Sequence, residues 1–405
     1  MRTVQEYWNG PRRTMKTRAW ACIVAVLSFV CFIIYICSGR KHDSAVYNVF
    51  EDITSIQWIS NNLAVATTMK MPIKPKPEVT VICVVACGKE KLDETLVMIK
   101  SALVYAKKPL KIIVITEYKL IPAFHEKLDE WKQIILETSN KTFDFVIRPV
   151  TYPNYIDENE WKSLFKPCAS LRLFLPDILN DTDSILYVDT DTLFLTQPEK
   201  VWKVFRSMNR DQFAALVKEC EDSNTCWYPR FAKHPYVLPV GINSGVMLMN
   251  LTRMRETRWT QYLEPILREF KNKITWGDQD IINIFFHFHP ENLYIFDCRY
   301  NYRPDHCMYG PVCNRALKDG AIILHGSRGV FHNKKQPPFY AVYQAMSQYQ
   351  LDTDPYERLL FQMKDFVTQE SASKCSIVWK VFIIRPELNL DKSALTMNYY
   401  QEDND

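Results

Sequence analysis

Short unbroken runs of hydrophobic residues alternate with amphipathic segments through the middle of this chain. Residues 79–88 (VTVICVVACG) and 111–116 (KIIVIT) are apolar runs of the kind that form strands buried on both faces. Between them, residues 93–105 place apolar side chains at helical spacing, with acids in the first turn. This succession of strand, helix and strand predicts a right-handed parallel unit at the start of an α/β fold.

The same alternation continues toward the C-terminus and predicts more elements. Further strands are expected at residues 144–150, 185–188, 212–217, 240–250 and 320–325. Further helices are expected at residues 124–138, 170–179 and 276–289. The pattern indicates one mostly parallel α/β domain over residues 79–349, with long loops in its second half. Residues 350–405 form a C-terminal extension with helical pieces and an acidic end, and we assign no chemistry to it.

Two aspartates stand one residue apart in the segment 184–195 (SILYVDTDTLFL), at the end of a predicted strand. In an extended backbone residues i and i+2 point to the same face, so Asp189 and Asp191 can aim their oxygens at one point while Thr190 faces away. Carboxylates at strand ends in such sheets hold Mg²⁺ or Mn²⁺ together with substrate phosphates. A polar turn or a helix cap explains an isolated D-x-D better, but the flanking apolar runs favour the cation.

Two later segments carry polar side chains at predicted element ends. Residues 276–280 (WGDQD) place Asp278 and Gln279 at the start of a helix, where capping is the simpler explanation. Asn243 and Gly245 lie at the start of a predicted strand. The glycine there either lets a ligand approach the backbone closely or simply belongs to a turn.

His325 ends the last predicted strand and is followed by glycines and cations. A lone histidine at a strand end is more often a capped core residue than a ligand. The neighbouring Gly326, Arg328, Lys334 and Lys335 favour phosphate binding instead, with the imidazole on a metal and a cation on the phosphate oxygens.

An uncharged run of 20 residues, 19–38, lies near the N-terminus. A helix of that length spans roughly the 30 Å hydrocarbon core of a bilayer, so the run predicts a single-pass transmembrane anchor. A cleaved signal peptide is the alternative, but Arg40 and Lys41 stand where small residues would precede a cleavage site. Five basic residues precede the run and two follow it, which predicts a type II protein with a cytosolic tail (1–18) and a luminal stem (39–78).

The composition agrees with a large folded body. Of the 405 residues 47% are hydrophobic, and a net charge of +4 without a basic block argues against nucleic acid as a partner. Nine cysteines lie outside the anchor, so at least one is free or intermolecular. The close pairs Cys220/Cys226 and Cys307/Cys313 are disulfide candidates in an oxidising lumen. Glycosylation sequons, which are meaningful only with a luminal placement, begin at Asn140, Asn180 and Asn250.

Taken in order, these segments resemble glycosyltransferase family 8, the retaining nucleotide-sugar enzymes with the GT-A fold, a Rossmann-like α/β fold. The resemblance covers roughly residues 79–349 and rests on VVACG, SLRLFLP, YVDTDTLFL, NSGVMLMN, WGDQDIIN and ILHG. Longer stretches, KPCASLRLFLP, WYPRFAKHPY, NSGVMLMNLTRMR, ITWGDQDIIN, NYRPDHCMYG and ILHGSRGVFH, are similar to the glucoside xylosyltransferase branch. That branch adds xylose from UDP-xylose to O-linked glucose on epidermal-growth-factor (EGF) repeats of Notch-type receptors. The resemblance therefore implies the same activity here, in the Golgi or the endoplasmic reticulum.

The resemblance also implies roles for individual residues. Asp189, Asp191 and His325 would hold Mn²⁺, or Mg²⁺, at the UDP diphosphate. Asp278 and Gln279 would bind the transferred sugar, with Gln279 stabilising positive charge at the anomeric carbon, because a carboxamide is a poor nucleophile. The resemblance places Ala86 and Cys87 at the uridine of the donor. Elsewhere around the donor it places Arg172, Thr190, Asn243, Gly245 and Gly326.

One departure from the family pattern leaves the cation at the diphosphate open. Many members follow the metal histidine with H-x-x-G-x-x-K, whereas here the glycines are Gly326 and Gly329 and the lysines are Lys334 and Lys335. Arg328 and the two lysines are therefore the candidates.

Two other interpretations keep the fold and change the function. UDP-glucose or UDP-galactose is an alternative donor, because one CH₂OH group separates xylose from glucose. A catalytically silent luminal protein that binds sugars is the third interpretation, and it predicts the loss of a metal ligand or of Gln279, all of which are present. The position in the fold would place acceptor choice in the aromatic loop 227–236 and around residues 300–309.

Overall fold

The computed structural model describes residues 79–139, 142–164, 168–369 and 373–390. The predicted tail, membrane anchor and stem (residues 1–78) lie outside the described residues, as does the sequon at Asn140. Within the described part, no helix has both the length and the hydrophobicity needed to cross a bilayer.

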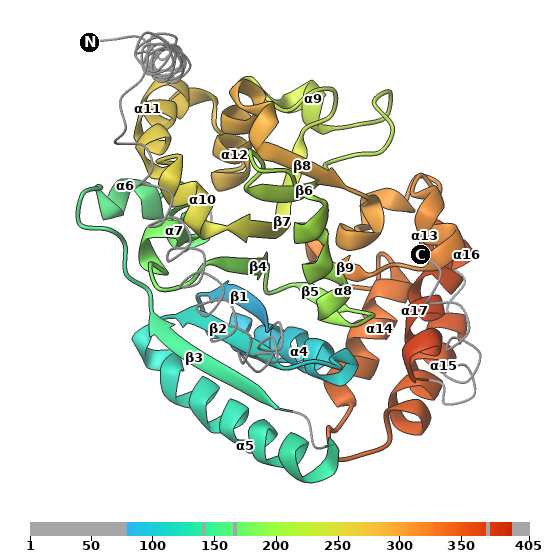
Figure 1. The fold of residues 1–405 in the computed structure, drawn as a ribbon. Helices are drawn as coiled ribbons and strands as arrows, with labels where there is room; N and C mark the ends of the chain where they lie inside the picture. Colours follow the sequence, from blue (N-terminus) through green and yellow to red (C-terminus); the bar gives the residue numbers. More distant parts are fainter. Residues whose placement is uncertain (1–78, 140–141, 165–167, 370–372, 391–405) are drawn as a thin grey trace, which may run out of the picture. The chain divides into compact units, whose positions relative to one another are not determined.

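A seven-stranded sheet forms the centre of the fold, and a two-stranded sheet lies beside it (Figure 1). The strands are β1 (Thr80–Ala86), β2 (Leu110–Thr116), β3 (Phe143–Pro149), β4 (Ser184–Val188), β5 (Thr192–Phe194), β6 (Ala214–Lys218), β7 (Ile242–Asn250), β8 (Leu293–Phe296) and β9 (Ile323–His325). The large sheet has the order β3-β2-β1-β4-β7-β6-β8. Four of its six strand pairs are parallel, and β7 is antiparallel to both of its neighbours. This confirms the predicted α/β class with a mostly parallel sheet.

The small antiparallel sheet joins β5 to β9. Thr192 of β5 pairs with His325 of β9, and the Gly326 N–H donates a hydrogen bond of 2.6 Å to the Asp191 carbonyl. This pairing brings the end of β9 to the turn after β4, although the two segments are far apart in the sequence.

Helices cover the large sheet and its edges. They are α4 (Glu90–Tyr105), α5 (Ile121–Ser139), α6 (Glu158–Lys162), α7 (Leu175–Ile178), α8 (Pro198–Trp202), α9 (Tyr228–Phe231), α10 (Leu251–Glu256), α11 (Thr260–Phe270), α12 (Asp278–Phe288), α13 (Asn314–Asp319), α14 (Pro337–Gln348), α15 (Phe361–Gln369), α16 (Lys374–Ile377) and α17 (Lys380–Leu390). Figure 1 shows α5 along β3, and α12 packs on β7. The buried face of α5 carries Phe124, Leu128, Trp131 and Ile135, at the three- and four-residue spacing of an amphipathic helix.

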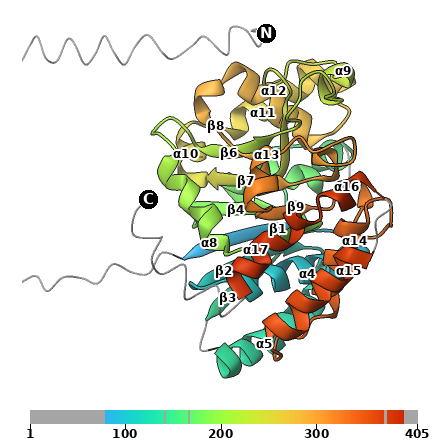
Figure 2. The ribbon, with the colours of Figure 1, turned by 90° about the vertical axis from the view of Figure 1, so that its right-hand side faces the viewer.

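The C-terminal helices share the hydrophobic core of the sheet. Helices α15 and α17 pack on α14 (Figure 2), and Leu360 and Phe382 are buried in the same core cluster as β1. Lys100 of α4 donates to the carbonyls of Ser347 and Tyr349 at the end of α14, over 2.9 and 2.7 Å. These helices are therefore a structural part of the fold that holds the site.

The predicted helix over residues 170–179 is wrong in form. The chain makes a 3₁₀ turn, Ala169–Phe174, followed by the short helix α7. Cys168 immediately precedes this 3₁₀ segment and has a φ of 62°, in the left-handed region, so the helical backbone cannot extend before Ala169. Pro176 has no N–H to give to the Arg172 carbonyl, so the α-helical hydrogen-bond pattern cannot continue through it.

Four disulfides join cysteines in the described part of the chain. They are Cys87–Cys168, Cys220–Cys226, Cys298–Cys313 and Cys307–Cys375. Within that part, Cys83 of β1 is the one free cysteine, and it is buried. The bond between Cys220 and Cys226 agrees with the prediction.

The predicted bond between Cys307 and Cys313 is wrong. Cys313 stands at the start of α13 and meets Cys298. Cys307 meets Cys375 of α16 instead. The helices at the C-terminal end supply a partner that closeness in the sequence does not reveal.

Candidate active site

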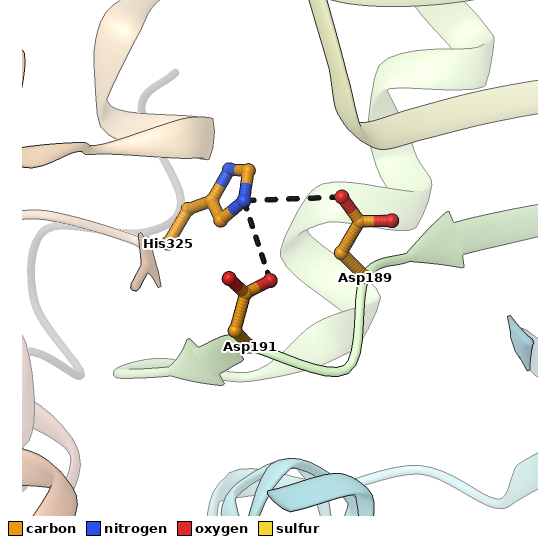
Figure 3. Close-up of side chains that lie close together, drawn as sticks. All are labelled: Asp189, Asp191 and His325. Atoms are coloured by element: carbon orange, nitrogen blue, oxygen red, sulfur yellow. Dashed lines mark ion pairs between the residues drawn. The ribbon is translucent and has the colours of Figure 1, made fainter. Parts of the chain in front are cut away.

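Two carboxylates and an imidazole converge where β4 ends (Figure 3). Asp189 and Asp191 lie in the turn between β4 and β5, and His325 ends β9. The His325 Nε2 lies 3.4 Å from an Asp191 oxygen and 3.8 Å from an Asp189 oxygen. One possible ligand atom from each residue lies within 4.8 Å of the others, so all three can hold one cation.

Asn301 fixes how the His325 ring faces the carboxylates. Its Oδ1 lies 2.9 Å from His325 Nδ1, and its Nδ2 donates to Asn243 Oδ1 over 2.8 Å. Because this amide oxygen can only accept, the network assigns the hydrogen to Nδ1 and leaves the Nε2 lone pair toward Asp189 and Asp191. A partner of this kind orients a histidine that binds a metal. Asn301 begins the motif NYRPDHCMYG, but sequence reasoning gave it no role, because its short 3₁₀ segment has no helix or strand pattern.

Replacing Asn301 with leucine, which is similar in size and has no acceptor, is expected to weaken Mn²⁺ binding about 10- to 100-fold. The unbound Mn²⁺ signal in electron paramagnetic resonance measures this affinity. Asn301→Asp keeps the acceptor oxygen and should retain most of the binding. Equal losses in both variants would contradict the orienting role.

Gly245 of β7 makes room for the histidine. A Cβ at this position would lie 2.2 Å from His325 Cε1 and 2.6 Å from Nδ1, closer than atoms can approach. The Gly245 carbonyl also accepts a hydrogen bond of 2.8 Å from the Asp189 N–H. The sequence offered Gly245 as a point where a ligand approaches the backbone, but here the His325 ring fills that space.

Arg172 connects the metal-ligand cluster to the start of α12. Its guanidinium donates to Asp189 Oδ1 over 2.8 Å and to the Ser244 carbonyl over 2.7 Å, and it lies 2.7 Å from Asp278 Oδ2. The Tyr187 ring centroid lies 4.6 Å from the guanidinium carbon. The side chain is buried, so the two carboxylates compensate its charge where water cannot.

A buried network holds Gln279. Its Oε1 accepts hydrogen bonds from Asn243 Nδ2 (3.2 Å) and from the Ser244 N–H (3.3 Å), and its Nε2 donates to Glu219 (3.2 Å). Glu219 also accepts from Asn243 Nδ2 over 2.8 Å, and burial raises the pKa of this carboxyl. Through Asn243 the network continues to Asn301 and so to the metal-ligand cluster. Sequence reasoning missed Glu219, which follows β6 without a recognisable motif.

Asp280 has a structural role in the same segment. It is fully buried, and its Oδ2 accepts hydrogen bonds from the Thr275 and Trp276 N–H groups over 2.7 and 2.8 Å. Its Oδ1 accepts a hydrogen bond of 2.7 Å from the Tyr228 hydroxyl. Asp280 thus accepts hydrogen bonds from backbone N–H groups in the turn before α12. This is a structural role of the capping kind that the sequence predicted for this segment.

Two adjoining cavities meet at this site and share Ala169, Arg172 and Asp189. The larger cavity has a volume of about 800 Å³, and its lining includes Cys87, Lys91, Tyr118 and Thr190. The smaller cavity has a volume of about 500 Å³, and its lining includes Glu219, Asn243, Asp278 and Gln279. Both volumes fall in the range of about 300–1,000 Å³ that is usual for ligand pockets.

The predicted donor residues divide between the cavity walls and the core behind them. Cys87 and Thr190 line the larger cavity. Ala86 is buried in β1 and lines neither of these two cavities. Gly326 packs closely on Phe331, whose ring a Cβ would meet at 2.4 Å, so its lack of a side chain serves packing.

The predicted cations lie in different places. Arg328 lines the smaller cavity and pairs with Asp305 over 2.7 Å. Lys334 and Lys335 line neither of these two cavities. Lys91, in the first turns of α4, lines the larger cavity and was missed, although its place just after the first strand was a usable signal.

A mostly parallel sheet, a cluster of two carboxylates and a histidine at its strand ends, and two cavities meeting there form the kind of site in which an α/β enzyme holds a divalent cation beside a phosphate-bearing substrate. Comparison with known proteins gives the family. Residues 82–325 match the profile of glycosyl transferase family 8, and the chain belongs to this family.

The relatives place the chain on one branch of that family. It is 44% identical to glucoside xylosyltransferase 1 of Homo sapiens over 315 residues, which cover 75% of this chain and 69% of the relative. It is also 44% identical to glucoside xylosyltransferase 2 of Xenopus laevis over 324 residues, 77% of this chain and 75% of the relative. The apo structure of mouse xyloside xylosyltransferase 1 aligns with a TM-score of 0.45 at 18% identity, covering 62% of this chain and 99% of the other.

Proposed function

We propose that this protein transfers xylose from UDP-xylose, in alpha linkage and with retention, to O-linked glucose on EGF-like repeats of Notch-type glycoproteins. The observation that carries the proposal is the 44% identity to a glucoside xylosyltransferase over most of both chains. The metal-ligand cluster and Gln279, which a silent sugar-binding relative would be free to lose, are present: Asp189 lines both cavities, and Gln279 lines the smaller one.

The donor set of the cluster fits Mn²⁺. Asp189, Asp191 and His325 offer two oxygens and an imidazole nitrogen, a mixture that Mn²⁺ accepts more readily than Mg²⁺, which prefers oxygen alone and stands as the alternative. When bound, the ion would offset the negative charge that develops on the departing diphosphate.

The chain's own side chains would place the two substrates. The larger cavity, whose lining includes Arg172 and Lys91, would take the UDP, and the smaller cavity would take the sugars. In the transfer the bond between xylose C1 and the diphosphate oxygen breaks, and the acceptor oxygen bonds to C1 on the same face. The acceptor hydroxyl's proton passes to a diphosphate oxygen, so UDP leaves and the glycoside forms.

Gln279 would stabilise positive charge at C1 without forming a bond to it. A carboxamide oxygen is a poor nucleophile. The Gln279 oxygen already accepts hydrogen bonds from Asn243 and Ser244, which makes it a still weaker one. The buried network around it would hold the oxygen dipole in place as charge develops.

The rate of transfer is expected to depend on the ionisation of Asp278. Burial raises the pKa of this carboxyl to about 6, with Arg172 opposing the rise and Asp189 adding to it. The ion pair with Arg172 is therefore complete above that pH and is lost as a proton adds below it. We expect kcat/KM to fall as the pH decreases through about 6 and to level off above it. A pH profile that keeps this inflection in Asp278→Asn would assign it to another group.

We infer that the protein is a type II membrane protein of the Golgi or the endoplasmic reticulum, anchored by residues 19–38. Four disulfides in the described part support an oxidising compartment for the body. Asn180 is exposed and suits glycosylation, whereas Asn250 is partly buried and its side chain accepts from the Arg253 N–H at the start of α10. Loss of a glycosidase-sensitive mass shift in Asn180→Gln would support the placement, and absence of any shift in the unaltered protein would oppose it.

Transfer by the full-length protein in detergent tests the proposed activity. Radiolabelled UDP-xylose, UDP-glucose and UDP-galactose are supplied with Mn²⁺ to an EGF repeat that carries O-glucose and to the same repeat without it. Transfer of xylose alone, only to the glucosylated repeat and abolished by EDTA, is the expected result. Transfer of another sugar would show that the donor is not UDP-xylose. Transfer to the bare repeat would show that the acceptor is not O-linked glucose.

A further inference from the structure

Three aromatic side chains line the smaller cavity, and we call them the aromatic shelf: Trp227, Phe231 and Trp276. The two indoles pack edge to face, with ring centroids 4.8 Å apart and an interplanar angle of 77°. Both are partly buried, whereas Phe231 is 59% exposed. An exposed phenylalanine at the wall of a cavity is a surface that a ligand or partner can cover.

Buried polar contacts fix the shelf relative to α12. Asp280 accepts hydrogen bonds from the Trp276 N–H and from the hydroxyl of Tyr228, which neighbours Trp227. His234 Nε2 lies 3.1 Å from the same carboxylate, and both side chains are fully buried. The disulfide between Cys220 and Cys226 closes the loop just before the shelf begins. Trp227 and Trp276 are therefore held in one unit with the start of α12, which carries Gln279, and Phe231 ends the short helix α9 beside them.

Apart from Ala169, the other residues that line the smaller cavity are polar or charged. They include Glu219, Asp278, Gln279, Arg303, Asp305 and Arg328. Aromatic faces and hydrogen-bonding groups in one cavity suit a sugar, whose ring has an apolar face of C–H bonds and a rim of hydroxyls. The C–H dipoles are positive toward the negative face of an aromatic ring, and the hydroxyls need paired donors and acceptors.

We propose that the aromatic shelf binds the glucose ring of the acceptor and holds it beside Gln279. This proposal rests on the proposed function, because glucose is the acceptor sugar there. The shelf lies in the cavity that shares Arg172 and Asp189 with the nucleotide-sized cavity, so a sugar on it lies next to the transferred sugar. Phe231, at the exposed end, would contact the part of the acceptor that reaches the surface.

A nucleobase is the other flat ligand that an aromatic residue could stack on. The larger cavity offers its own exposed ring, Tyr118, and does not include the shelf. The shelf should therefore affect the affinity for glucosides and leave the affinity for UDP unaltered, and this difference separates the two occupants.

Binding to the full-length protein tests the shelf without relying on transfer. Titration calorimetry with UDP and Mn²⁺ present measures the dissociation constants of p-nitrophenyl β-glucoside and of an O-glucosylated EGF repeat. Saturation-transfer NMR reports whether protons of the glucose ring lie against aromatic side chains. We expect Trp227→Ala and Phe231→Ala each to weaken the affinity for the glucosylated repeat about tenfold. The dissociation constant of UDP should stay within about twofold.

Phe361→Ala is the matched control, because Phe361 of α15 is similarly exposed (54%) and lines neither cavity. This variant should bind every ligand like the unaltered protein. The proposed role of the shelf would be wrong if both shelf variants kept the glucoside affinity of the unaltered protein. It would also be wrong if the unaltered protein did not bind the glucoside. A weaker affinity for UDP in Trp227→Ala would reassign it to the nucleotide. Hydrolysis of UDP-xylose by the unaltered protein tests the donor separately. If hydrolysis is absent, the proposed function is contradicted, and glucoside binding still tests the role of the shelf.

Discussion

The Asp191→Asn protein is expected to lose transfer on the order of 10³-fold while keeping its fold. Asparagine has the same shape as aspartate, and the side chain is partly exposed, so the substitution leaves the packing around β5 intact. It removes one of the two negative charges that would hold the cation, and an amide is a weaker ligand than a carboxylate. The affinity for Mn²⁺ should fall together with the rate.

Transfer at several Mn²⁺ concentrations measures this loss, and thermal unfolding checks the fold. Asp144→Asn is the matched control, because Asp144 on β3 is exposed and pairs with Lys132 away from the site. Recovery of the full rate at high Mn²⁺ would show that Asp191 serves only affinity. An unaltered rate at low Mn²⁺ would remove Asp191 from the metal site.

Gly245→Ala is expected to displace His325 and to weaken Mn²⁺ binding about 100-fold. The added Cβ would lie 2.2 Å from His325 Cε1, and the backbone of β7 is held there by its pairing with β4, which includes the hydrogen bond from the Asp189 N–H to the Gly245 carbonyl. The ring is the part that must move, away from the position that Asn301 gives it. Mn²⁺ binding and thermal unfolding report the two consequences.

A double-mutant cycle separates this cause from a general loss of stability. If the clash with the ring explains the effect, Gly245→Ala should lower the free energy of unfolding in the native background. It should change it little in the His325→Ala background, where the ring is absent. Equal destabilisation in both backgrounds would mean that Gly245 acts through another neighbour.

The large sheet could be predicted because its strands are continuous apolar runs. The predicted strands 79–88 and 185–188 correspond to β1 and β4, and Asp189 and Asp191 converge as predicted, although they lie in the turn after β4 and not in an extended strand. Local pattern predicts the strands, because a continuous apolar run suits a strand that is buried on both faces. His325 needed more, because only the pairing of β9 with β5 brings it to the aspartates, and the family resemblance supplied that expectation.

The residues that orient the site could not be predicted from pattern. Asn301 ends a short 3₁₀ segment and Glu219 follows β6, at positions that the helical and strand periods do not specify. Their roles come from contacts between segments far apart in the sequence, and those contacts exist only in the folded chain. The same reason explains the disulfide error, since Cys375 lies 68 residues beyond Cys307.

The disulfide between Cys307 and Cys375 can form only after the ribosome has added Cys375, late in synthesis. Arg303 and Asp305, which line the smaller cavity, lie just before Cys307, and their segment is fastened only once Cys375 has been made. The residues that line the larger cavity lie between Val85 and Asp191, so the ribosome finishes them first. A chain that ends early would retain every residue for the nucleotide and lack the bond that fastens the acceptor side. Because the C-terminal helices share the hydrophobic core with β1, such a chain would also lose part of the packing that supports the nucleotide cavity.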